Sequence, residues 1–193
     1  MRIGVLGLQG AVREHVRSLE RLGIASTVVK RTSELEKLDG LILPGGESTA
    51  ISLLADGPFL ERLRELAHAG FPMFGTCAGM ILLAARVDGK DSPYIRGIDI
   101  DVERNASGRQ VDSFETELEV NGIGAFPAIF IRAPYIVRHG ANVEAMARHD
   151  GRLVMARQGR VLAASFHPEL TADLRIHKCF VDMIKTGEKE DAE

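Results

Sequence analysis

The chain has 193 residues, of which 45% are hydrophobic and 26% are charged, and its formal net charge is −3. These values predict a soluble globular protein with a large core, and the slight negative charge gives no general reason to expect nucleic acid or an anionic membrane as a partner. Cys77 and Cys179 are the two cysteines, too few for a disulfide framework. With neither a signal peptide nor a membrane-spanning run in the sequence, we expect a cytoplasmic protein.

The first half of the chain alternates apolar runs of strand length with amphipathic helical patterns. Residues 2–8 form a glycine-rich apolar run typical of a buried parallel strand, and apolar side chains recur at helical spacing over 12–22. Further strand-like runs lie at 25–29, 40–43 and 71–74, and a helical pattern covers 59–67. This alternation predicts an α/β domain with a mainly parallel sheet.

The hydrophobic pattern of the sequence changes at residue 97. Short, often alternating runs broken by Gly, Pro and Asn continue to residue 158, which predicts antiparallel strands at the sheet edge with functional loops between them. A buried strand over 161–166 and an amphipathic helix over 176–184 follow. We expect residues 1–187 to form a single domain and 188–193 to be a charged, frayed tail.

Gly75-Thr76-Cys77-Ala78-Gly79 stands between a strand-like run and the helix-like run 80–85. A nucleophile flanked by glycines at such a junction is the pattern of a nucleophile elbow, here with cysteine in place of serine. The turn puts the Cys77 sulfur at a helix N-terminus, where free N–H groups favour a thiolate. Most lone cysteines are small core residues, as we predict for Cys179 on the apolar stripe of the last helix.

His167-Pro168-Glu169 follows the last predicted strand and supplies a base for the thiol. Residues i and i+2 of extended backbone point the same way, so Glu169 can orient the His167 imidazole toward Cys77. Alone, this tripeptide would be read as a turn with surface side chains, but together with the elbow it predicts a Cys-His-Glu triad. The remaining histidines show no such pattern and are expected on the surface or on helix faces: His15, His68, His139, His149 and His177.

Leu43-Pro44-Gly45-Gly46-Glu47-Ser48-Thr49 follows the third predicted strand. Loops at the carboxyl ends of parallel strands gather at one edge of the sheet, so this loop should face the elbow. A phosphate cradle is the rival interpretation, but the Gly-Lys-Ser/Thr of a P-loop is absent. We predict instead an oxyanion hole formed by the backbone N–H groups of Gly46 and Ala78.

Two later polar segments, around Arg104 and Arg132, are loop-like. A charge-rich loop is usually only solvated, but an amino-acid substrate needs groups that hold its carboxylate and its ammonium. Arg104 and Arg132 are candidates for the carboxylate, and Glu47 for the ammonium.

These motifs resemble the class I (triad) glutamine amidotransferases, and more narrowly the glutaminase subunits of pyridoxal 5′-phosphate synthases. The broad resemblance rests on 75–79, 44–46 and 167–169, and the narrow one on 4–15, 45–50, 104–115 and 131–134. Ser107 departs from the family pattern, in which an aromatic residue is expected. The resemblance implies a three-layer, flavodoxin-like fold with helices on both faces of the sheet and antiparallel edge strands.

It also implies hydrolysis of L-glutamine to L-glutamate and ammonia through a Cys77 thioester, without a cofactor or a metal. The implied glutamine-binding residues are Gly46, Glu47, Ser48, Arg104, Ile131 and Arg132. The implied partner is a separate synthase subunit, which uses the ammonia for vitamin B6 biosynthesis within a large hetero-oligomer.

Two alternatives remain open. A cysteine hydrolase of another amide or γ-glutamyl substrate would share the elbow, but would not need the Arg104 and Arg132 segments in this form. A non-catalytic α/β protein with a redox-sensing cysteine would have no need of His167-Pro168-Glu169.

Overall fold

The computed structural model describes residues 1–46, 57–104 and 113–190. The helices are α1 (Val12–Arg21), α3 (Gly57–His68), α4 (Ala78–Leu83) and α5 (Arg175–Glu190), with two 3-10 turns, η1 (Thr32–Leu35) and η2 (Pro168–Leu170). The strands are β1 (Arg2–Leu6), β2 (Ala25–Val29), β3 (Gly40–Leu43), β4 (Met73–Thr76), β5 (Ala84–Val87), β6 (Lys90–Asp91), β7 (Ile98–Glu103), β8 (Phe114–Val120), β9 (Gly124–Phe130), β10 (Tyr135–His139), β11 (Glu144–His149), β12 (Arg152–Gln158) and β13 (Val161–Ala164).

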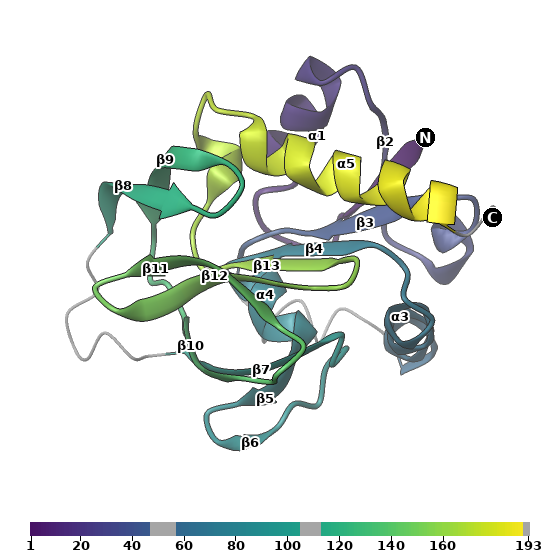
Figure 1. The fold of residues 1–193 in the computed structure, drawn as a ribbon. Helices are drawn as coiled ribbons and strands as arrows, with labels where there is room; N and C mark the ends of the chain where they lie inside the picture. Colours follow the sequence, from purple (N-terminus) through teal and green to yellow (C-terminus); the bar gives the residue numbers. More distant parts are fainter. Residues whose placement is uncertain (47–56, 105–112, 191–193) are drawn as a thin grey trace.

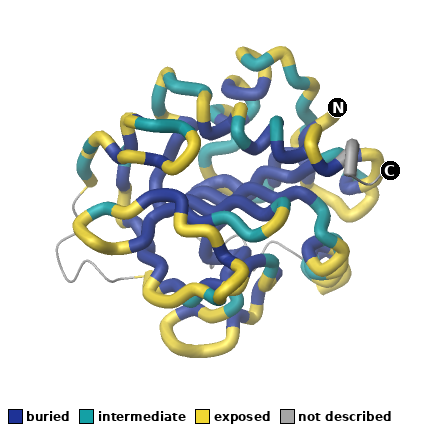
Figure 2. Tube along the Cα trace, in the orientation of Figure 1, coloured by how far each residue is buried: buried dark blue, intermediate teal, exposed yellow. Residues whose placement is uncertain are grey.

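The parallel part of the sheet has the strand order β2-β1-β3-β4-β13. Strands β3, β4 and β13 are buried along their whole length, which Figure 2 shows as dark blue at the centre of the molecule. Burial on both faces explains why these strands read as continuous apolar runs in the sequence.

Helices cover both faces of this part of the sheet (Figure 1). Successive strand residues point to opposite faces, so Leu41 and Leu43 belong to one apolar cluster and Ile42 to the other. The first cluster includes side chains of α3 and α4, and the second includes side chains of α1 and α5. The predicted α/β fold with three layers is confirmed.

The remaining strands are mostly antiparallel. The order continues from β13 through β12, β10 and β7, while β11 links β12 to the β8–β9 hairpin. Strand β5 pairs in parallel with β7 and antiparallel with the short β6. The antiparallel strands predicted over 97–158 are therefore present, in the part of that segment that the structure describes.

Two element ends differ from the sequence prediction. The apolar run 80–85 is helical only to Leu83, because Ala84 takes extended backbone and begins β5, whose pairing with β7 replaces the helical hydrogen bonds. At the other end of the chain, α5 continues to Glu190 and thus includes the first residues of the predicted tail. No helix within the described ranges is long and apolar enough to cross a membrane.

The close contact between α4 and β3 leaves no room for a side chain at Gly79. A Cβ atom there would lie 1.9 Å from the carbonyl oxygen and 2.7 Å from the carbonyl carbon of Leu43. Both are backbone atoms of a buried strand, so the clash cannot be relieved by a change of rotamer.

Gly79→Ala should therefore lower the free energy of unfolding by more than about 2 kcal/mol, as expected for forced overpacking. Gly57→Ala is the matched control, since a Cβ at that position meets no atom of the described residues within 4 Å. Urea denaturation followed by circular dichroism measures both variants. Equal unfolding midpoints for the two would contradict the packing described for α4.

Candidate active site

Cys77 occupies a strained turn between β4 and α4. Its φ of 49° and ψ of −105° lie outside the favourable regions for an L-residue, and its N–H donates to the Ala164 carbonyl of the adjacent strand at 2.8 Å. A Cβ at Gly75 would meet the Gly79 carbonyl oxygen at 2.5 Å, so the turn needs glycine at both flanking positions. This is the backbone geometry of a nucleophile elbow, with the Cys77 side chain at the start of α4.

His167 and Glu169 lie together at the end of β13. The imidazole Nδ1 is 2.8 Å from Glu169 Oε1, and both side chains are buried. The His167 N–H donates to the Ile129 carbonyl, and Pro168 starts the 3-10 turn that carries Glu169. The predicted pairing of His167 with Glu169 is thus present, but a 3-10 turn and not extended backbone brings the two side chains together.

The protonation of His167 follows from its partners. Burial lowers the pKa of His167, but hydrogen bonds with Cys77 and Glu169 and their negative charges outweigh burial and raise the pKa to about 10. The imidazole therefore carries a proton at neutral pH and can hold a thiolate beside it.

The glycine loop after β3 faces the elbow, as predicted. A Cβ at Gly45 would lie 2.4 Å from Cε1 of His167 and 3.2 Å from Cβ of Cys77. Only a residue without a side chain leaves room at this point for both catalytic candidates.

Hydrogen bonds fix the Gly45 backbone on two sides. Its N–H donates to Thr76 Oγ1 at 3.1 Å, and its carbonyl accepts from the Ala11 N–H at 3.1 Å. Because C=O and N–H point in opposite directions across a trans peptide, the Gly46 N–H is directed away from Ala11. Ala78 is the first residue of α4, where an N–H has no acceptor within the helix.

The predicted substrate-binding residues that the structure describes lie in different surroundings. Ile131 lies at the elbow, since its carbonyl oxygen is 3.9 Å from Cys77 Sγ, and Arg132 follows with φ of 46° and an exposed side chain. Arg104 is instead paired with Asp88, with Nε 2.6 Å from Oδ2. Glu47, Ser48 and Ser107 lie outside the described residues.

Two of the other histidines lie on helices, His15 on α1 and His177 on α5, and neither is at the surface. Both are completely buried, and Nδ1 of His15 is 3.0 Å from Nε2 of His177. His15 Nε2 is 3.2 Å from Thr76 Oγ1 and 3.6 Å from Glu169 Oε2. Helical spacing was the only feature of the sequence that could have indicated the burial of His15, which stands four residues before the buried Leu19 on the apolar face of α1.

Both of these histidines are neutral at physiological pH. Burial, followed by the nearby His177 and His167, lowers the pKa of His15 well below its usual value. Burial alone lowers the pKa of His177 to about 4.

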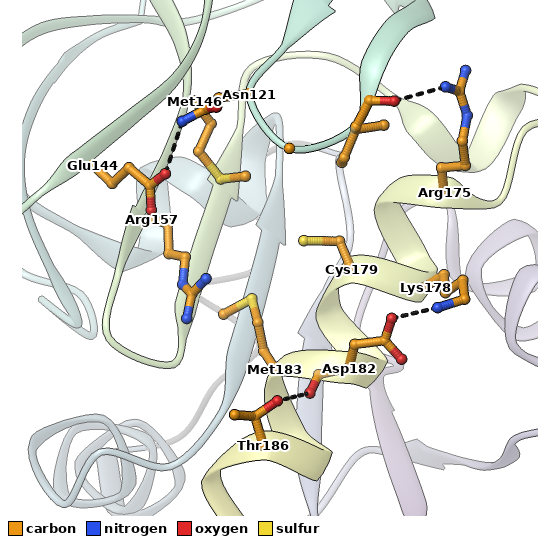
Figure 3. Close-up of a pocket in the computed structure, with 12 residues that line it drawn as sticks. Asn121, Glu144, Met146, Arg157, Arg175, Lys178, Cys179, Asp182, Met183 and Thr186 are labelled. Atoms are coloured by element: carbon orange, nitrogen blue, oxygen red, sulfur yellow. Dashed lines mark hydrogen bonds and ion pairs between the residues drawn. The ribbon is translucent and has the colours of Figure 1, made fainter.

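A separate pocket of about 520 Å³ lies between α5, β11, β12 and the β8–β9 turn (Figure 3). Cys179 extends into it from α5, near Met146 and Met183, and none of the three triad candidates lines it. The Cys179 thiol is half-buried, and burial raises its pKa, which disfavours the nucleophilic thiolate. Cys179, predicted as a core residue, is therefore only half-buried: it packs against the second apolar cluster and also lines this pocket, apart from the triad candidates.

The raised pKa of His167 predicts that this side chain controls the reactivity of Cys77. In a Cys179→Ser background at neutral pH, iodoacetamide should alkylate Cys77 more slowly in His167→Asn than in the protein that keeps His167, because the variant lacks the protonated imidazole that stabilises negative charge on the sulfur. Equal rates for the two proteins would show that His167 does not control the thiol.

Comparisons with known proteins agree with this geometry. The sequence profile of the SNO glutamine amidotransferase family matches residues 5–186. A pyridoxal 5′-phosphate synthase subunit PdxT from Geobacillus sp. (strain WCH70) is 56% identical over 187 residues, which cover 96% of this chain and 97% of the relative. A PdxT from Bacillus licheniformis (strain ATCC 14580) is 53% identical over 192 residues, covering 98% of both.

Among solved structures, a crystal structure of a glutamine amidotransferase superposes with a TM-score of 0.90 at 48% identity. The match covers 95% of this chain and 98% of the other. Since sequence and structure agree over nearly the whole length, the chain belongs to the SNO glutamine amidotransferase family.

Proposed function

We propose that this chain hydrolyses L-glutamine to L-glutamate and ammonia, and that it is the glutaminase subunit of a pyridoxal 5′-phosphate synthase. The observation that carries the proposal is a cysteine elbow next to a buried His167–Glu169 pair, whose nitrogen and oxygen are 2.8 Å apart. Family membership and the likeness to PdxT proteins over nearly the full chain support the substrate and the partner.

The first step is attack of the Cys77 thiolate on the side-chain amide carbon of glutamine. The new C–S bond pushes the carbonyl electron pair onto oxygen, which becomes an oxyanion. The backbone N–H groups of Gly46 and Ala78 are the proposed donors to it.

The second step expels ammonia. The His167 imidazolium gives its proton to the amide nitrogen, the C–N bond breaks, and a γ-glutamyl thioester remains on Cys77. His167, now neutral, takes a proton from water as the water attacks the thioester, and glutamate leaves with the sulfur restored as a thiolate. Glu169 orients the imidazole and stabilises its charge throughout.

The α-carboxylate of glutamine needs a cation near the elbow. Arg132 is the first candidate, because its neighbour Ile131 contacts the Cys77 sulfur and no ion pair occupies its guanidinium among the described residues. Arg104 is a second candidate. Its pair with Asp88 is exposed and worth at most about 1 kcal/mol, so it can change partner. Glu47 and Ser48 complete the proposed substrate site.

The ammonia is proposed to pass to a separate synthase subunit within a large hetero-oligomer. Release of ammonia from glutamine, measured with and without that subunit, tests both parts of this proposal. Hydrolysis of a peptide or γ-glutamyl substrate, with no action on free glutamine, would refute it.

Cys77→Ala should lower ammonia release by more than about 10³-fold, because no other group replaces the nucleophile. Cys179→Ser is the matched control and should retain most activity, since that side chain lines a different pocket. Both are assayed with saturating synthase subunit, and far-ultraviolet circular dichroism checks the fold. Substantial turnover by Cys77→Ala would remove Cys77 from the mechanism.

Arg132→Ala should raise KM for glutamine with a smaller effect on kcat, because its guanidinium is proposed to hold the substrate carboxylate. A loss of one charge-assisted hydrogen-bonding partner corresponds to about a tenfold rise or more. Arg138→Ala is the control, as Arg138 pairs on the surface with Asp99 and Asp101. An unchanged KM with weakened binding to the synthase subunit would move Arg132 from the substrate site to the interface.

A further inference from the structure

A row of buried polar groups lies behind the Glu169 carboxylate. Thr76 of β4, His15 of α1 and His177 of α5 are all fully buried, and they meet in an otherwise apolar layer beside Phe74. The distances are 3.2 Å from Thr76 Oγ1 to His15 Nε2 and 3.0 Å from His15 Nδ1 to His177 Nε2. The triad mechanism does not use any of these three side chains.

Glu169 leaves one oxygen in need of a donor. Oε1 accepts from His167, whereas Oε2 is buried and accepts no hydrogen bond from the described residues. A buried carboxylate oxygen without a donor is costly. His15 Nε2, at 3.6 Å, is the polar nitrogen that faces this oxygen.

This environment selects one tautomer of His15. With the proton on Nε2, the N–H points at Thr76 Oγ1 and Glu169 Oε2, and Nδ1 is free to accept from the Nε2–H of His177. With the proton on Nδ1, the Nε2 lone pair would face a carboxylate oxygen. His177 would then carry its proton on Nδ1, which has no partner among the described residues.

We propose that His15 is a positioning residue, which holds the Glu169 carboxylate from behind through its Nε2–H and is kept in that tautomer by His177. The inference rests on the proposed glutaminase function. Through Thr76 Oγ1, which also accepts the Gly45 N–H, the same imidazole connects the triad to the glycine loop opposite Cys77.

Loss of His15 removes the polar nitrogen that lies 3.6 Å behind Oε2, so that only the hydrogen bond to His167 holds the carboxylate and the carboxylate can rotate. The His167 imidazole is then less well aimed in the steps where it gives and takes a proton. Substrate binding should be unchanged, because the described polar contacts of the His15 imidazole are to protein side chains behind the site, those of Thr76, Glu169 and His177. The defect should therefore fall on kcat and leave KM unchanged.

The test compares His15→Leu with His15→Gln, whose side-chain amide can place an N–H near the position of Nε2. With saturating synthase subunit, His15→Leu should lower kcat by about 10- to 100-fold, the cost of losing a partner that orients an active-site group. KM for glutamine should stay within about twofold, and His15→Gln should recover most of the rate. Leu19→Ala is the matched control in α1: it opens a cavity and lowers Tm without touching a polar group, and its kcat should be normal.

A double-mutant cycle then asks whether His15 acts through Glu169. In a Glu169→Ala background, His15→Leu should cost less than about twofold more, because the carboxylate that it positions is gone. A full loss in that background, equal losses for the Leu and Gln variants, or a normal kcat in His15→Leu would each overturn the inference. Lack of ammonia release by the wild-type complex would instead overturn the proposed function on which it rests.

Discussion

The sharp turn at Cys77 is the constraint on which the rest of the site depends. A φ of 49° with a ψ of −105° costs conformational energy, and it persists because the surrounding packing leaves no alternative. Gly75 and Gly79 let α4 approach β4 and β3 to within backbone contact, and the Cys77 N–H is bonded to β13. The order β3-β4-β13 in the sheet therefore sets which loops surround the sulfur: the glycine loop on one side and His167 on the other.

Burial and hydrogen-bonding partners determine the protonation state of each histidine near the site. His167, between a thiol and a carboxylate, has its pKa raised to about 10, while the adjacent His15 and His177 have theirs lowered by burial. Three neighbouring imidazoles thus hold different protonation states at the same pH. The raised pKa identifies His167 as the group that exchanges protons, whereas the lowered pKa values of His15 and His177 fit neutral groups that position their neighbours.

Much of this arrangement could be predicted from local sequence. The elbow and His167-Pro168-Glu169 are short motifs marked by glycine and proline, although Glu169 lies in the 3-10 turn η2 and not in the extended backbone expected for it. The alternation of strands and helices indicated an α/β domain with a mainly parallel sheet, and the family resemblance implied its three layers. His15 and His177 could not be placed, because 162 residues separate them and their contact exists only once α1 and α5 pack on the same face of the sheet. The pairing of Arg104 with Asp88 and the early end of α4 at Leu83 likewise depend on strand partners that local patterns do not reveal.

The central claim is that Cys77 forms a covalent bond to the γ-carbonyl of glutamine. Rapid acid quench of the complex during turnover, followed by peptide mass spectrometry, measures this directly. We predict a γ-glutamyl group on the peptide that contains Cys77. An acyl group on another residue, or ammonia release by the wild type through a route that never labels Cys77 even when quenched within a single turnover, would contradict it.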